Sequence, residues 1–197
     1  MDPESKSPDP KELQELMARS GPRLKAYVRL KAGPILLERE SADDLVQSVY
    51  RDILENFDRF GHGGEKGMHR WLFKTAERKI ADRYEYYGAQ KRDIRRESRL
   101  PAAPFSDTGS VEDEEQLLAC YRGFYTPSQQ AEAREELARF EWGFAKLPPE
   151  QQEVVLRAKL LGESRREIAE ALDKSEEAVR AQLYRALSVL AAHMDDL

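Results

Sequence analysis

The residues best suited to chemistry lie in a basic and aromatic stretch around Trp71. Five cations recur at short helical spacings, namely Arg70, Lys74, Arg78, Lys79 and Arg83, and the rings of Trp71, Tyr84, Tyr86 and Tyr87 interleave with them. Lys and Arg hold phosphates while aromatic rings stack on unpaired bases, so this pattern predicts binding of a single nucleic-acid strand. A solvated helix with core aromatics has the same pattern, and core packing explains Trp71 and Phe73 at least as well.

A second candidate surface lies between Ser164 and Met194. Ser164 followed by Glu167 predicts a capping box at the start of a short helix, and Asp173-Lys174-Ser175 predicts a turn that Ser175 closes as the next cap. The longer helix then has an inward apolar stripe made of Val179, Leu183, Ala186, Leu187 and Leu190. Arg180, Gln182 and Arg185 lie off that stripe, which is typical of a helix-turn-helix that reads the DNA major groove. An ordinary helical hairpin with a charged outer face is the alternative.

The sequence predicts no covalent chemistry, no metal and no cofactor. His62, His69 and His193 lack metal-site spacing, and Cys120 has no His or Cys near it. The glycine-rich stretch 61–64 lacks the preceding strand and the following Lys-Ser/Thr of a phosphate loop. We therefore expect a binding protein and not an enzyme.

Composition predicts an all-α protein. Of the 197 residues, 40% are hydrophobic and 35% charged, and long Val/Ile/Thr alternation is absent. The net charge is −5, but it is segregated, since residues 65–99 hold eleven Lys and Arg against six Asp and Glu, and residues 105–141 hold three against nine. The lone cysteine, the absence of a signal-like start and the absence of a run of about 18 apolar residues predict a cytoplasmic protein without a membrane span.

Helix boundaries predict two small helical domains joined by a linker. We expect helix starts at Asp9-Pro10, Ser41, Thr126-Pro127 and Leu147-Pro148, an interruption or kink at Gly21-Pro22, and a stop at Gly33-Pro34. Pro101 and Pro104 break the basic helix, and an acidic stretch follows them. The predicted division is an N-terminal domain at 1–98, an acidic linker at 99–127 and a C-terminal helix-turn-helix domain at 128–197.

With these parts in order, the chain resembles an extracytoplasmic-function sigma factor, one of the small promoter-recognition subunits of bacterial RNA polymerase. Four stretches carry the resemblance in the family's order: residues 43–50 with Asp-Leu-Val-Gln, residues 71–76 with Asp82 beyond them, Leu-Pro-Pro-Glu-Gln-Gln at 147–152, and the helix-turn-helix at 162–186.

The resemblance implies a role for each matching surface. Core polymerase binding, at the clamp helices of the largest subunit, would fall to Asp43, Asp44 and Gln47. The −10 element and its opened strand would be held by Arg70, Trp71, Lys74, Arg78, Lys79 and Arg83. The −35 element would be read by Arg180, Ala181, Gln182 and Arg185, with Lys174 and Ser175 on phosphate. The implied partners are core polymerase, also through its flap, and promoter DNA.

Departures from the family's pattern leave the promoter sequence open. Arg78 and Glu85 stand where Asn and Arg are usual, and Ala178 and Gln182 stand where Thr and Arg are frequent. Two rivals therefore remain: a free-standing helix-turn-helix regulator, and a polymerase-binding adaptor without promoter recognition. An anti-sigma factor, phosphorylation and expression control are all compatible means of regulation.

Overall fold

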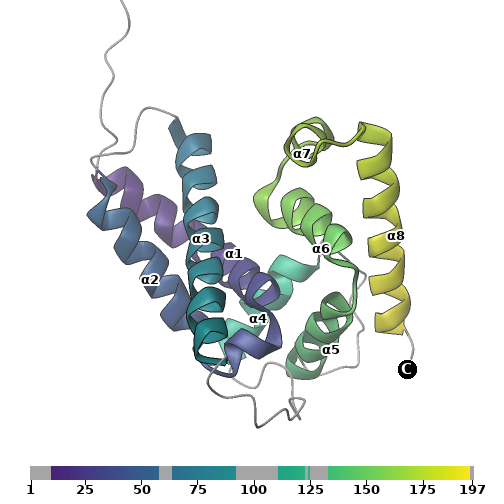
Figure 1. Cartoon of the computed structure of the whole chain (residues 1–197), viewed down its shortest axis with the longest axis horizontal. Helices are drawn as coiled ribbons and strands as arrows, with labels where there is room; N and C mark the ends of the chain where they lie inside the picture. Colours follow the sequence, from purple (N-terminus) through teal and green to yellow (C-terminus); the bar gives the residue numbers. More distant parts are fainter. Residues whose placement is uncertain (1–9, 58–63, 92–110, 123, 125–132, 196–197) are drawn as a thin grey trace, which may run out of the picture. The chain divides into compact units, whose positions relative to one another are not determined.

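The chain folds into helices that divide into two compact units (Figure 1). The structure is a computed structural model that describes residues 10–57, 64–91, 111–122, 124 and 133–195, and this part of the chain contains no β-strand. The units are Met1–Pro101 and Ala102–Leu197. The all-α prediction is thereby confirmed for the described residues.

Within residues 10–57 and 64–91, the first unit is a bundle of three helices, each of which packs against the other two. They are α1 (Pro10–Leu37), α2 (Ala42–Glu55) and α3 (Gly64–Lys91). The core holds Leu24, Leu45, Ile53, Leu72 and Phe73, all with exposed fractions of 2% or less. Burial on this scale supplies the main stabilisation of such a bundle, because isolated helices are marginal in water.

Helix α1 is interrupted at one of the two places that the sequence suggested. The helix continues through Gly21-Pro22, and the non-helical residue is Gly33, with φ 62° and ψ 174° just before Pro34. Ser20 and Leu24 are buried on either side of Pro22, so packing offsets the cost of the missing backbone hydrogen bond. At Gly33 the left-handed backbone favours glycine, which makes this the position where the chain can turn.

The described part of the second unit contains five helices and one π-helical turn. They are α4 (Val111–Tyr121), α5 (Ala133–Ala145), α6 (Pro149–Leu156), η2 (Arg157–Leu161), α7 (Arg165–Leu172) and α8 (Glu176–Asp195). Helix α8 packs against α5, α6 and α7, and α4 packs against α5. Val154, Ile168, Ala169 and Val179 form the small core under the helix-turn-helix.

Part of the predicted linker is a packed helix. Helix α4 lies inside residues 99–127, and its Tyr121 ring stacks on Phe140 of α5 at 4.5 Å while its hydroxyl donates to Glu141 at 3.0 Å. Phe124 also packs on Phe140, with ring centroids 5.2 Å apart. The acidic composition concealed this helix, whose buried residues include Leu117, Leu118 and Tyr121. Residues 92–110 and the expected domain start near residue 128 lie outside the described residues.

Candidate polymerase and DNA interfaces

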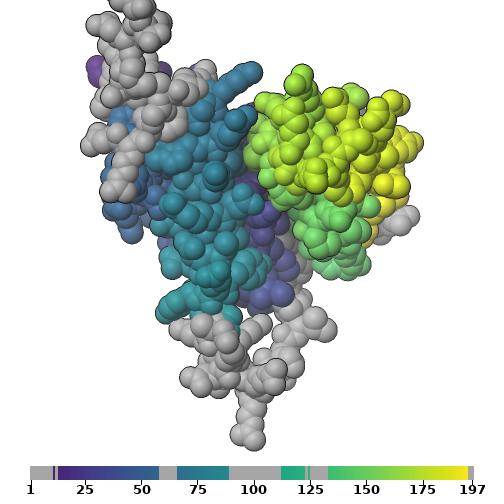
Figure 2. Space-filling view, turned by 45° about the horizontal axis from the view of Figure 1, so that its top comes forward, coloured from purple at the N-terminus to yellow at the C-terminus, as the bar shows by residue number. Residues whose placement is uncertain are grey.

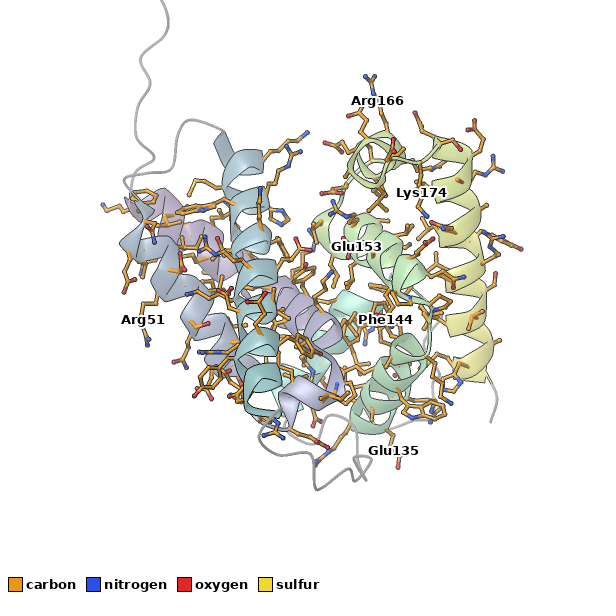
Figure 3. The ribbon with its side chains drawn as sticks, viewed as in Figure 1. Arg51, Glu135, Phe144, Glu153, Arg166 and Lys174 are labelled. Carbon is orange, nitrogen blue, oxygen red and sulfur yellow. The ribbon has the colours of Figure 1, made fainter. Side chains whose placement is uncertain are left out.

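The first candidate surface is the N-terminal end of α2. Ser41 caps the helix, since its hydroxyl accepts the Asp44 N–H at 3.0 Å, as the sequence predicted. Asp43, Asp44 and Gln47 are all exposed. Asp43 also pairs with Lys25 of α1 at 2.9 Å, so this acid has a local structural role besides any external one. Further along the helix, Arg51 points away from the bundle (Figure 3).

The second candidate surface is the basic face of α3. Arg70, Lys74 and Arg78 follow one another at four-residue spacing and are all exposed. Trp71 is half-buried, whereas Phe73 is 1% exposed and packs edge-on against Tyr27, with centroids 5.2 Å apart. The core explanation therefore holds for Phe73. In Figure 2, α3 forms much of the visible face of the first unit.

Three of the six predicted −10 residues are anchored by carboxylates. Asp52 of α2 lies 2.8 Å from the Lys79 ammonium and 2.9 Å from the Arg78 guanidinium. The hydrogen bond from Lys79 holds the pKa of Asp52 below its usual value, and Arg78 adds to this while burial opposes it. Arg83 lies 2.7 Å from Glu40, a charge contact without hydrogen-bond geometry. A phosphate reaching these cations must compete with acids already in place.

The tyrosines at the end of α3 differ in their availability. The Tyr84 hydroxyl donates to the Ala32 carbonyl of α1, and burial raises the pKa of that hydroxyl, although the side chain is 44% exposed. Tyr86 is 55% exposed and meets Tyr87 edge-on, while Arg39 lies over the Tyr87 ring at 5.7 Å. Tyr86 therefore presents the most open of these three rings.

The third candidate surface is the helix-turn-helix of α7 and α8. Its predicted boundaries are confirmed, because Ser164 and Glu167 form a reciprocal capping box and Ser175 accepts the Ala178 N–H at 3.1 Å. Between them Asp173 takes the left-handed conformation, with φ 52°, and ends α7. Lys174 is labelled at this turn in Figure 3.

The predicted −35 residues divide into two groups. Ser175, Arg180, Ala181 and Arg185 are exposed. Lys174 and Gln182 are instead held by Glu150 at the start of α6, with distances of 2.6 Å from the Lys174 ammonium and 2.9 Å from the Gln182 amide nitrogen. These two hydrogen bonds, that from Lys174 first, hold the pKa of Glu150 below its usual value.

Sequence reasoning missed Tyr184, the most exposed large hydrophobic residue of α8. Its side chain is 74% exposed and follows Ala181 by three residues and Glu177 by seven, on the outer face opposite Val179 and Ala186. The helical phase of the apolar stripe could have placed it there. No group of three or more His, Cys, Asp or Glu in the described residues is arranged to hold a metal ion.

Comparison with known proteins points to one family of DNA-binding domain. Residues 144–190 match the family described as Sigma-70, region 4. A solved structure of CnrH in complex with the cytosolic domain of CnrY is similar to the chain, with 22% identity and a TM-score of 0.54 over 96% of this chain and 91% of that one. The search of curated protein sequences returned no match. None of the described helices is long and apolar enough to cross a membrane.

Proposed function

We propose that this chain, a sigma factor with a sigma-70 region 4 domain at its C-terminal end, recognises promoters by using a separate DNA-binding surface on each unit. The single observation that carries the proposal is the region 4 match over the helix-turn-helix, combined with the outward face of α8 that displays Arg180, Ala181, Tyr184 and Arg185. A helix-turn-helix places such a face in the major groove. The function needs no covalent chemistry and no cofactor, and it places the protein in the cytoplasm.

The first unit would bind core polymerase and the −10 element. Asp43, Asp44 and Gln47 are exposed on α2 and suit a basic protein surface such as the clamp helices of the largest subunit. The cations of α3 would hold the opened strand, and Arg70, Lys74 and Arg78 are the exposed ones among them. Trp71 and Tyr86 offer ring faces for stacking, whereas Arg78, Lys79 and Arg83 would first exchange their carboxylate partners.

The second unit would bind the −35 element and contact the polymerase flap. Arg180 and Arg185 flank the outer face of α8 and can reach base edges or phosphate, and Ser175 lies at the helix start. The functional division we propose keeps residues 1–98 and 128–197 as the two DNA-binding domains. We assign α4 to the second unit and keep only the stretch before it as a connector.

A regulatory partner is also part of the proposal. CnrH, whose fold the chain shares, was solved in complex with the cytosolic domain of CnrY. We propose that this chain also forms a complex with another protein, and that this partner acts as a regulator by covering polymerase-binding or DNA-binding surfaces. Co-purification of such a partner from the native host would support this part of the proposal.

One experiment separates the proposal from its rivals. The purified chain is added to bacterial core RNA polymerase with a pool of random promoter sequences, and transcripts are sequenced. Promoter-dependent transcripts that share two spaced elements are expected. Polymerase binding without transcripts would identify an adaptor, and tight DNA binding without polymerase would identify a free-standing regulator.

The polymerase contact has its own test. Neutralising both acids in the variant D43N/D44N should weaken the binding of core polymerase by about tenfold or more, because charge complementarity at the interface is lost. Asn is preferable to a basic replacement, since Asp43 pairs with Lys25 and both acids lie in the first turn of α2. E55Q, at the other end of the same helix, is the matched control. Equal affinities for wild type and D43N/D44N would remove this assignment.

A further inference from the structure

Glu150 is an acid placed where a DNA-binding protein would normally display cations. It lies in the first turn of α6, outside the helix-turn-helix, yet its carboxylate contacts the turn of the motif through Lys174 and the second helix through Gln182. The Glu150 side chain is 68% exposed and that of Lys174 is 25% exposed. The ion pair therefore lies at the surface, and an incoming phosphate can replace the carboxylate.

The Gln182 amide gives independent evidence that Glu150 fixes a neighbouring side chain in place. Its nitrogen donates to Glu150, while its oxygen is buried and has no hydrogen-bond partner among the described residues. A buried amide oxygen without a partner is unfavourable, and it marks a side chain kept in place by its other contact. An amide held this way cannot make the two-sided hydrogen bonds with which Gln reads adenine.

The charges around the helix-turn-helix show why the contact of Glu150 with Lys174 would affect DNA binding. Arg166 pairs with Glu170 at 2.9 Å on α7, and Glu176 and Glu177 occupy the first turn of α8. Lys174 is the cation at the turn itself, next to the start of α8, where a helix-turn-helix meets the DNA backbone. Occupation of Lys174 by Glu150 removes a cation from that place.

We propose that Glu150 is an intramolecular competitor for DNA phosphate, which holds Lys174 and Gln182 in the free protein and yields them when the −35 element binds. This inference rests on the proposed function, because it assumes that α8 meets promoter DNA. Glu150 is a positioning residue: it acts through Lys174 and Gln182 and does not itself touch DNA. By occupying Lys174 and Gln182, Glu150 weakens the binding of the protein to any phosphate backbone. The full set of −35 contacts can form only after DNA has replaced Glu150 at these two side chains.

The proposal has a signature in the salt dependence. When a DNA phosphate displaces the Glu150 carboxylate from Lys174, the freed carboxylate binds a cation from solution. This uptake offsets the release of one cation from DNA. The variant E150Q leaves no such charge, so the plot of log affinity against log salt should steepen by up to about 0.9, the value for one phosphate contact. Affinity at low salt should rise roughly two- to fivefold, the range expected for an exposed ion pair.

The experiment measures promoter affinity of the assembled holoenzyme by footprinting at about 50 to 200 mM salt. Wild type, E150Q, K174Q and the double variant E150Q/K174Q form a cycle, and the gain seen in E150Q should vanish when Lys174 is absent. E135Q is the matched control, because Glu135 lies in the same unit at the end opposite Lys174 and loses the same charge (Figure 3).

Each outcome decides the matter. A steeper slope and a gain that depends on Lys174 support the competitor role. A loss of affinity with an unchanged slope would show that Glu150 only braces the motif. If replacing Glu150 still raises promoter affinity in the K174Q background, or if E135Q raises it equally, the effect arises from net charge alone. If wild-type holoenzyme protects no promoter, the proposed function fails and this inference fails with it, whereas protection by wild type with an unchanged E150Q overturns the inference alone.

Discussion

The contact of Asp52 with Lys79 and Arg78 should stabilise the first unit measurably. The variant D52N keeps the shape of the side chain and an acceptor oxygen but removes the charge. The Asp52 side chain is 13% exposed and that of Lys79 is 30% exposed, so their 2.8 Å contact is partly screened from water. The Arg78 side chain is 60% exposed, and its contact behaves more like a surface pair.

These exposures set the expected magnitude. A hydrogen bond to a charged group contributes about 1.5–3 kcal/mol when it is sheltered, and a surface ion pair contributes less than about 1 kcal/mol. Because Asn retains part of the first interaction, we expect D52N to lower the free energy of unfolding by about 1–2.5 kcal/mol at pH 7. For a unit of this size that corresponds to a fall in Tm of roughly 5–15 °C.

The pH dependence of the stability difference between wild type and D52N identifies the charge of Asp52 as the cause of that difference. The pKa of Asp52 in the folded protein is lowered, so its ionised form contributes stability above the unfolded value of about 3.9. That contribution is lost as the pH falls through the lowered pKa. The gap between wild type and D52N should therefore be constant from about pH 5 to 8 and narrow below about pH 4.

Urea unfolding followed by circular dichroism at several pH values measures the gap. D82N, which neutralises an exposed acid on α3, is the control and should stay within about 0.5 kcal/mol of wild type. A D52N gap below about 0.3 kcal/mol at pH 7, or one that keeps its size in acid, would refute the reasoning, since the ion pair would then contribute no charge-dependent stability.

Two further predictions concern the packing and capping of the helices. G143A should destabilise the second unit by roughly 1–3 kcal/mol in thermal unfolding, because a Cβ at this position would lie 2.5 Å from the His193 ring. In G88A the added Cβ meets nothing within 4 Å, so this variant should stabilise α3 by up to about 1 kcal/mol. Equal effects at the two glycines would contradict this. S164A should cost about 1 kcal/mol, since the capping box at α7 is lost, while S188A on the exposed face of α8 should be nearly neutral. This prediction would be contradicted if S188A lost stability and S164A did not.

Helix starts were predictable because they depend on local chemistry. Ser41, Ser164 and Ser175 each cap a helix through a hydroxyl that accepts a backbone N–H three residues on, and this pattern can be read directly from the sequence. In α1 the interruption expected at Gly33-Pro34 is found at Gly33, whereas the kink expected at Gly21-Pro22 is not, because buried residues carry the helix through Pro22.

Long-range ion pairs were beyond the sequence. Lys79 and Asp52 are separated by 27 positions, and Lys174 and Glu150 by 24, so neither pair follows from helical periodicity. The basic residues were predicted as a set, but the acids that contact them come from other helices. Helix α4 was missed for a related reason, since acidic residues dominate its composition, and the burial of Leu117, Leu118 and Tyr121 is evident only once α5 lies beside it.

Under the proposed function, the paired cations would explain how an acidic chain can bind DNA selectively. Arg78, Lys79, Arg83 and Lys174 each face a carboxylate, so phosphate gains little by replacing a partner of equal charge. If these surfaces meet DNA as proposed, they would bind it weakly by charge alone, and sequence-specific contacts and polymerase would supply the remaining free energy. Under the proposal, the same exchange would suppress binding to arbitrary DNA more than to a promoter, because only at a promoter would both units gain specific contacts. We therefore expect the isolated protein to bind weakly and the holoenzyme to bind with high selectivity.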